Sequence, residues 1–376
     1  MGIVCPNMDN SGGLSSSEPC QEISGKYGVV HKGRYEDWFY NRSRRKKEGV
    51  HPVKKRILIL SAVLLAAVLA VLFAFLLLYG PSFGIYLRKP SPQDYGESAL
   101  AFMENGYYSS TEEWREAKAA AQDALRTAQS YEDTWPILRD ALSAAGGVHS
   151  RLITRAEEEE AGENPITLPL VSTDSMEHGI VTLVIPEFTQ GEERAQEYAQ
   201  IVLSWLREHH DATGVILDLR GNRGGDLAPM ICALSPLLPD GPLLGVRYAN
   251  GQMNTMTLAD GSFTGGSGMK VESFKMPDTI PIAILTGEWT ASSGEAVLLA
   301  FRGLENVRSF GSPTAGYPST NTVFRLYDGT QIVLTIGADV VLRTGEVFCE
   351  EPIPPDVLTD SPEQEAAAWI RSRFSS

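Results

Sequence analysis

Residues 281–302 have the sequence PIAILTGEWTASSGEAVLLAFR, and this stretch decides the fold. Its first part, 281–286, is apolar or β-branched and stops at Gly287, which predicts a buried strand. Residues 295–302 predict a helix, so Ser292 and Ser293 lie where strand turns into helix. A serine hydroxyl there stands at the end of a rigid strand, beside helix N–H groups that can receive an oxyanion. The alternative is a serine that only caps the helix.

The segments before this stretch alternate between strand and helix patterns. Residues 179–185 and the nearly continuous apolar run 214–220 predict strands, and 192–209 predicts an amphipathic helix between them. This alternation indicates a layered α/β domain. Further upstream, residues 91–145 have a helical pattern that ends at the Gly146-Gly147 stop signal. Residues 157–160 are four glutamates, which we expect in an acidic surface loop.

A single apolar segment divides the chain. Residues 57–79 contain no charged side chain and would form a helix about 34 Å long, enough to cross a bilayer. Lys and Arg side chains crowd its N-terminal flank, which predicts a cytoplasmic N-terminus. Residues 1–56 carry 11 Lys/Arg against 6 Asp/Glu, whereas the rest carries 21 against 41. An acidic domain of this kind argues against nucleic acid as a partner.

The four cysteines give little evidence for a metal or disulfide site. Cys5 and Cys20 fall on the predicted cytoplasmic side, where disulfides are rare, and the chain has no CxxC. Cys232 and Cys349 would lie outside the cell, where they are free to pair or to stay reduced. We therefore expect no metal and no cofactor.

Two further features bear on catalysis. The glycine turn 221–226 lacks the spacing of a phosphate-binding loop. It predicts either backbone N–H groups that face a cleft, as in an oxyanion hole, or only a tight turn that needs positive φ. Among the six histidines, only His149 follows a glycine break on a loop outside the predicted cytoplasmic part. Taken alone, it is as well explained by a structural or surface role.

Four motifs occur in order along the chain: GVILDLRGNRGG (214–225), TASSGE (290–295), GSPTAG (311–316) and PIPPD (352–356). This set resembles the C-terminal processing (tail-specific) peptidase family, which includes the tricorn core protease, over roughly residues 91–374. The resemblance implies a ClpP/crotonase-like α/β core and a serine nucleophile, which matches to Ser292. It also implies an oxyanion hole made by the glycine turn, Gly224 and Gly225, with the amide of Ser293.

The match departs from the processing branch of that family at two points. Its lysine base would stand where this chain has Tyr317, whose phenol is a poor base. The tricorn-like branch uses a histidine from the start of the domain, and GGVHS (146–150) resembles that element, which assigns the base to His149. Glu350 or Glu351, with preference for Glu350, would orient the imidazole. Only about 30 residues separate Ser150 from the strand at Gly179, too few for a PDZ domain.

We therefore predict a single-pass plasma-membrane serine endopeptidase with its catalytic domain outside the cell and a protein or peptide substrate. The predicted parts are a basic cytoplasmic tail (1–56), a transmembrane helix (57–79), a linker (80–90), a helical cap (91–150) and an α/β catalytic core (151–376). Two alternatives stay open: a catalytically inactive module of the same fold that binds peptides or apolar ligands, and an esterase that uses the same serine. The sequence does not indicate an oligomeric state.

Overall fold

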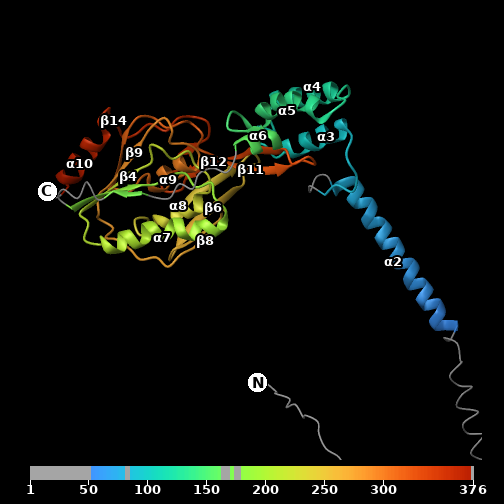
Figure 1. Cartoon of the computed structure of the whole chain (residues 1–376), viewed down its shortest axis with the longest axis horizontal. Helices are drawn as coiled ribbons and strands as arrows, with labels where there is room; N and C mark the ends of the chain where they lie inside the picture. Colours follow the sequence, from blue (N-terminus) through green and yellow to red (C-terminus); the bar gives the residue numbers. More distant parts are fainter. Residues whose placement is uncertain (1–51, 81–84, 162–169, 173–178, 374–376) are drawn as a thin grey trace, which may run out of the picture. The chain divides into compact units, whose positions relative to one another are not determined.

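The computed structural model describes residues 52–80, 85–161, 170–172 and 179–373. Most of the predicted cytoplasmic tail, with Cys5 and Cys20, lies outside these residues. The chain divides into two compact units, Met1–Val71 and Leu72–Ser376. The expected layered, mixed α/β fold is confirmed (Figure 1).

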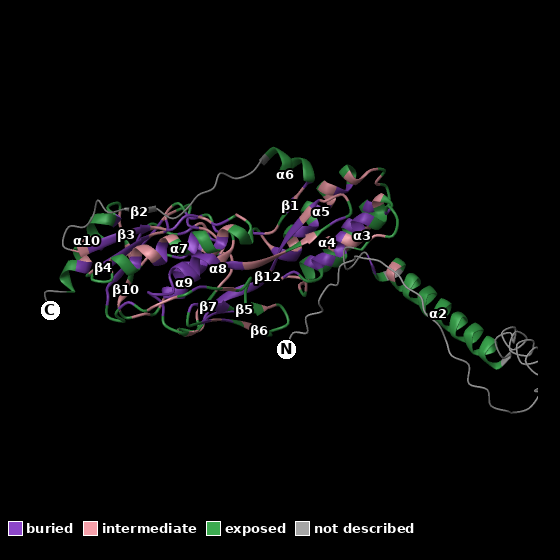
Figure 2. Cartoon of the chain, turned by 60° about the horizontal axis from the view of Figure 1, so that its bottom comes forward, coloured by how far each residue is buried: buried purple, intermediate pink, exposed green. Residues whose placement is uncertain are grey.

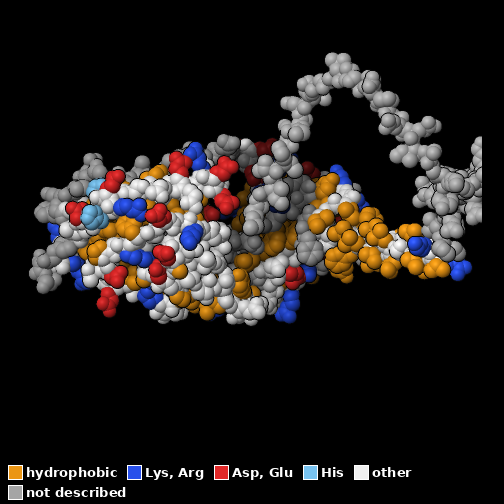
Figure 3. Space-filling view, turned by 90° about the horizontal axis from the view of Figure 1, so that it is seen from below, with side chains coloured by type: hydrophobic (Ala, Val, Ile, Leu, Met, Phe, Trp, Pro, Cys, Tyr) orange, Lys and Arg blue, Asp and Glu red, His pale blue; other side chains and the backbone are white. Residues whose placement is uncertain are grey.

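The apolar segment forms the long helix α2 (Pro52–Tyr79), and within the described residues Val53–Leu77 is long and apolar enough to cross a membrane. No residue of its most apolar stretch is buried within the described part of the chain, and Figure 2 shows most of the helix exposed. Figure 3 shows apolar side chains along the helix and basic side chains at its end. Such a surface fits lipid far better than water.

A six-stranded, mostly parallel sheet forms one layer of the core. Its order is β14-β10-β9-β4-β3-β2, and only β2 runs antiparallel to its neighbour. The strands β9 and β4 lie at its centre with buried side chains on both faces, as their continuous apolar sequences predict. The bounds are β2 (Leu170–Ser172), β3 (Ile180–Val184), β4 (Gly214–Asp218), β9 (Ile282–Thr286), β10 (Val307–Gly311) and β14 (Val357–Leu358).

An eight-stranded antiparallel sheet forms the second layer. It follows the order β1-β12-β5-β6-β7-β8, and β11 and β13 also pair with β12. The strands are β1 (Arg151–Ile153), β5 (Gly241–Tyr248), β6 (Met253–Ala259), β7 (Ser262–Thr264), β8 (Met269–Lys270), β11 (Ser319–Arg325), β12 (Gln331–Val341) and β13 (Val347–Phe348).

Helices fill the space between the sheets and cover their outer faces. The main core joins both sheets with helices α7 (Glu192–Glu208), α8 (Leu227–Ala233) and α9 (Ser293–Phe301). The other face of the six-stranded sheet packs against α10 (Pro362–Ser372), through residues such as Ile216 and Ile370. The central strands are therefore buried on both sides, and their ends are held rigidly.

A helical cap covers one end of the second sheet (Figure 1). It consists of α3 (Pro92–Met103), α4 (Glu112–Leu125) and α5 (Tyr131–Gly146), and side chains at Ser91, Thr111 and Ser130 cap the three N-termini. Ile332 and Leu334 of β12 pack into this cap, whereas Val341 of the same strand belongs to the main core. The long strand β12 thus joins the cap to the core.

One local expectation is wrong. The four glutamates at 157–160 form the short helix α6 (Arg155–Ala161) rather than a loop. Thr154 and Glu157 explain why the helix starts here. The Thr154 hydroxyl accepts from the Glu157 N–H at 3.2 Å, and the Glu157 carboxylate accepts from the Thr154 N–H at 2.8 Å. This reciprocal pairing is a capping box, which starts a helix.

Candidate active site

Ser292 lies at the turn between β9 and α9 with a backbone conformation that is rare for its residue type. Its φ is +52° and its ψ is −119°, and it is one of two non-glycine residues with positive φ in the described chain. Such a conformation costs on the order of 1–3 kcal/mol and persists only where surrounding contacts enforce it. Backbone strain of this kind clusters at functional sites.

The carboxylate of Glu295, in the first turn of α9, holds this turn in place. It is fully buried and accepts hydrogen bonds from the N–H groups of Ser292 (2.7 Å), Gly316 (3.0 Å) and Tyr317 (2.9 Å) and from the Thr314 hydroxyl. Burial raises the pKa of Glu295, and the four hydrogen bonds oppose that rise. One carboxylate therefore joins the Ser292 turn to residues 314–317.

The predicted glycine turn lies directly against Ser292. A Cβ on Gly224 would stand 2.8 Å from Ser292 Cβ, so only glycine allows this approach. The Gly224 N–H donates to Asn222 Oδ1 at 2.9 Å and is thus occupied. Within the described residues, the N–H groups of Gly225 and Ser293 carry no hydrogen-bond partner, while Ser293 Oγ donates to Gly225 O at 2.6 Å. Two of the three expected oxyanion donors are therefore unoccupied.

Asn222 fixes the turn to the strand beside it. Its side chain is fully buried, and the side-chain amide donates to Ile185 O at 3.0 Å. Its backbone carbonyl accepts from the Ala291 N–H at 2.9 Å. Thr290 Oγ1 also donates to Leu219 O at 2.9 Å. The glycine turn thus bonds to the residue before Ser292 through Asn222 and to the residue after it through Gly225.

His149 lies on the loop between α5 and β1 and is 7% exposed. Its Nδ1 is 2.8 Å from Ser319 Oγ, and its ring lies 5.1 Å from that of Tyr317. Burial, and then the positive charge of Arg151, lower the pKa of His149 to about 4. The imidazole is therefore neutral at physiological pH, and with Nδ1 bonded to Ser319 it has Nε2 left for catalysis.

Glu350 and Glu351 lie differently from what was expected. Glu350 accepts from the Val148 N–H (2.6 Å) and from the Tyr108 hydroxyl (3.0 Å), so it binds the backbone next to His149 rather than the ring. Glu351 is exposed. Ser319 occupies the place at Nδ1 that the sequence assigned to a glutamate.

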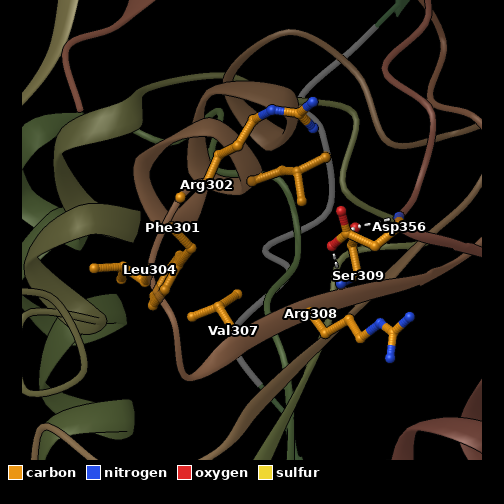
Figure 4. A pocket seen from close by; sticks show the side chains of 9 residues that line it. Phe301, Arg302, Leu304, Val307, Arg308, Ser309 and Asp356 are labelled. Carbon is orange, nitrogen blue, oxygen red and sulfur yellow. Dashed lines mark hydrogen bonds between the residues drawn. The ribbon is translucent and has the colours of Figure 1, made fainter. Parts of the chain in front are cut away.

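Ser292 and Ser319 line one cavity of about 220 Å³, so the hydrogen-bond partner of His149 and Ser292 face the same space. Within the described residues no hydrogen bond joins the Ser292 hydroxyl to His149. Catalytic hydrogen bonds of this kind often tighten only when substrate binds. A cavity of about 480 Å³ at the C-terminal end of α9 does not include Ser292; there Asp356 accepts from Ser309 (Figure 4).

In the part of the chain that the structure describes, no group of three or more His, Cys, Asp or Glu side chains could hold a metal ion. Cys232 and Cys349 are both free. The Cys232 thiol is buried and faces backbone carbonyls, whereas Cys349 Sγ lies 3.7 Å from the Tyr108 hydroxyl. The pairing that the sequence left open is therefore not formed.

Sequence reasoning missed three residues of the site. Glu295 stands three residues after Ser292, the spacing of a capping box, and that signal could have identified it. Asn222 and Ser319 had no such signal, because their partners depend on how distant segments meet.

Comparison with known proteins agrees with this geometry. Residues 179–359 match Peptidase family S41. The chain is 38% identical over 312 residues to the nisin-resistance protein of Lactococcus lactis subsp. lactis, covering 82% of this chain and 96% of that protein. It is 28% identical over 200 residues to the carboxy-terminal processing protease CtpA of Bacillus subtilis (strain 168), covering 52% of this chain and 39% of that protein.

A solved lipoprotein structure from Streptococcus agalactiae is 32% identical, with a TM-score of 0.69, and the match covers 77% of this chain and 99% of the lipoprotein. The shared fold, the matched family region and the full-length relative agree with the motifs read from the sequence. The chain belongs to peptidase family S41 and is a serine peptidase.

Proposed function

We propose that this chain is a membrane-anchored serine endopeptidase in which Ser292 is the nucleophile and His149 the general base. The observation that carries the proposal is the strained Ser292 turn, flanked by two unoccupied N–H groups and sharing a cavity with the serine that binds His149. Strain and unpaired donors are expected where a reacting group must be held before substrate arrives.

The reaction follows from these groups. Ser292 Oγ attacks the carbonyl carbon of the scissile bond, and its proton passes to Nε2 of His149. The N–H groups of Gly225 and Ser293 donate hydrogen bonds to the carbonyl oxygen as negative charge forms on it. The C–N bond then breaks as His149 returns the proton to the leaving amine, and a water hydrolyses the acyl-enzyme by the same route.

The hydrogen bond to Ser319 supports this order of proton transfer. Nε2 can accept a proton only if Nδ1 carries the hydrogen of the neutral ring. The Ser319 oxygen, 2.8 Å from Nδ1, then accepts that hydrogen and holds the ring plane. A pKa near 4 keeps the base free of protons across the physiological range.

The anchor and the substrate complete the proposal. Lys54, Lys55 and Arg56 stand at the N-terminal end of the apolar helix, which supports a cytoplasmic N-terminus and an extracellular catalytic domain. The relative named for nisin resistance covers most of the chain, and we infer that nisin is a substrate to test first. Loss of intact nisin on incubation with the purified protein, but not with Ser292→Ala, would support this.

A fluorophosphonate probe tests the nucleophile. We expect labelling of the purified protein and its loss in Ser292→Ala, whereas Ser312→Ala, which changes an exposed serine, keeps the label. If Ser292→Ala labels as well as the parent protein, the nucleophile is another residue. A protein that is never labelled but binds peptides would instead be the inactive binding module, and turnover of small esters alone would indicate an esterase.

A further inference from the structure

The cavity beside Ser292 has an acidic and partly apolar lining. It opens between α8, α9 and the second sheet, and its apolar walls include Leu227, Met256 and Phe263. Two carboxylates line it, Asp226 and Asp339, and no Lys, Arg or His is among its lining residues. Its volume of about 220 Å³ would hold about seven waters at about 30 Å³ each, enough for one long side chain.

Asp339 is the more deeply placed of the two acids. It lies on β12, where its backbone is in register with Val246 of β5 and Phe348 of β13, so the strands on both sides fix it. The side chain is 4% exposed. Its Oδ1 accepts from the Thr320 hydroxyl at 2.8 Å, whereas Oδ2 takes no hydrogen bond from any described residue. A buried carboxylate with an unused oxygen in a cavity is costly unless a donor or cation meets it.

Asp226 is the second carboxylate of the cavity, and it also caps a helix. It caps α8 by accepting from Ala228 N at 3.0 Å, and the Ser267 hydroxyl bonds the same oxygen, Oδ1. Its Oδ2 accepts no hydrogen bond from a described residue. Hydroxyl and amide oxygens of Ser319, Thr320 and Asn321 line the same space and can accept the remaining hydrogens of a bound cation.

We propose that this cavity binds the side chain of a lysine or arginine whose carbonyl is attacked by Ser292, with Asp339 as its counter-ion. This rests on the proposed function, because it assigns a specificity to the same serine. The residue that carries the attacked carbonyl is the one nearest to Ser292, Ser293 and Gly225, and all three line the cavity. The stem of a lysine packs on the apolar walls while its ammonium reaches the carboxylates.

The protonation state of Asp339 gives a second test of the proposal, because it makes cation binding depend on pH. Burial raises the pKa of Asp339 to about 7, and the negative charge of Glu295 on α9 adds to this rise. The other titratable groups facing it are Asp226 across the cavity and Cys349 beyond β13. The carboxyl is neutral below this pKa and negative above it, so binding of a cation strengthens as pH rises through 7.

The experiment compares three fluorogenic peptides that differ only in the residue before the scissile bond: lysine, norleucine or glutamate. For the parent protein we expect kcat/KM to be at least about tenfold higher for lysine than for norleucine, and lowest for glutamate. That lysine-to-norleucine ratio should fall at least about tenfold in Asp339→Asn. In the control Asp240→Asn, whose carboxylate pairs with Lys275 at the surface, the ratio stays unchanged.

The pH dependence tests the parent protein without any substitution, in case Asp339→Asn fails to fold. The lysine-to-norleucine ratio should rise several-fold between pH 6 and pH 8, and His149 does not contribute because it serves both substrates equally. A lysine-to-norleucine ratio of one or less overturns the proposal. So does a lysine-to-norleucine ratio that does not change with pH and is the same in Asp339→Asn as in the parent protein. If Ser292 is still labelled by a fluorophosphonate in that case, the peptidase assignment stands and only the specificity is wrong.

Discussion

The two halves of the catalytic site are built in different ways. The half that holds Ser292 is fixed within the core, since Glu295 accepts from the Ser292 N–H and the Asn222 carbonyl accepts from the Ala291 N–H. The half that holds His149 is a loop of the cap region, fixed by Ser319 at the ring and Glu350 at the neighbouring N–H. Ser292 is thus positioned by its own sheet and helix, and the His149 loop by residues 170 or more positions away along the chain.

The two halves also differ in the elements that hold them. The Ser292 turn follows a strand buried on both faces, and its strain is held by a buried carboxylate. The His149 loop follows a helix of the cap, where Gly147 has a φ of +73° and a Cβ there would collide with the Glu350 carboxylate. The relative position of the two halves therefore depends on the long strand β12, which packs into both cores.

Removal of the base has the largest expected effect. We expect His149→Ala to lower kcat/KM by about 10³-fold, because a positioned general base contributes about 10² to 10⁴-fold. Labelling of Ser292 by a fluorophosphonate should slow in parallel, since its proton has no acceptor.

The pH profile of the parent protein gives a second measure of the same residue. With a pKa of about 4 in the folded protein, the imidazole is unprotonated above pH 5 and protonated below pH 4. We expect kcat/KM for a norleucine substrate to be level between pH 5 and 8 and to fall on the acid side. A drop centred near pH 6.5 would show that His149 is more solvated than the structure has it.

Loss of the Glu295 carboxylate tests the half that holds Ser292. Oε1 accepts from Thr314 and Gly316 and Oε2 from Ser292 and Tyr317, so the amide of Glu295→Gln would turn its NH₂ toward two donors in either orientation. We expect stability to fall by about 3 kcal/mol and kcat to drop about 10²-fold. Thermal unfolding and kinetics measure both.

Glu159→Gln is the matched control, because that side chain is exposed and pairs only with Arg155 on the surface. It should change stability by no more than about 0.5 kcal/mol. If Glu295→Gln unfolds at the temperature of this control and keeps full activity, the strained turn is held by its strand and helix alone.

The sequence predicts the six-stranded, mostly parallel sheet better than the eight-stranded antiparallel sheet. Strands such as 214–218 and 282–286 are continuous apolar runs, and local patterns decide them. The antiparallel sheet also needs distant strands to meet, because β12 pairs with β1 and with β5. Arg151 opposite Val333 is one such pair, and no local pattern of residues specifies it.

The same distinction applies to the site. Ser292, the glycine turn and the spacing to Glu295 are visible within short segments, whereas His149 was assigned as the base only through the resemblance of residues 146–150 to the tricorn-like branch. Ser319 and Asp339 were not predicted, since each matters only through a contact made in the folded chain. Glu350 was expected to orient the imidazole, but in the structure it accepts from the backbone N–H of Val148 and not from the ring.

A smaller effect is expected at Ser319, which holds the imidazole rather than reacting. Ser319→Ala leaves the Nδ1–H of a buried histidine without its acceptor, and we expect kcat to fall about tenfold with little change in KM. Ser235→Ala is the control, because Ser235 is also buried and hydrogen-bonded but lies outside the cavity. An equal loss in both variants would mean that the effect is one of general stability.

The smallest effect, and the sharpest test of how the base is oriented, concerns the two glutamates. In Glu350→Gln the amide oxygen can still accept from Val148 N–H and the NH₂ can donate to the Tyr108 oxygen, so both contacts survive without the charge. We expect kcat to change less than about threefold, and Glu351→Gln, at an exposed position, to change nothing measurable. If the carboxylate instead acted on the imidazole as in a Ser-His-Asp triad, removing its charge would cost orders of magnitude in kcat. A loss of that size in Glu350→Gln would mean that the loop moves on substrate binding so that the glutamate replaces Ser319 at Nδ1, whereas a small one assigns the orienting role to the serine.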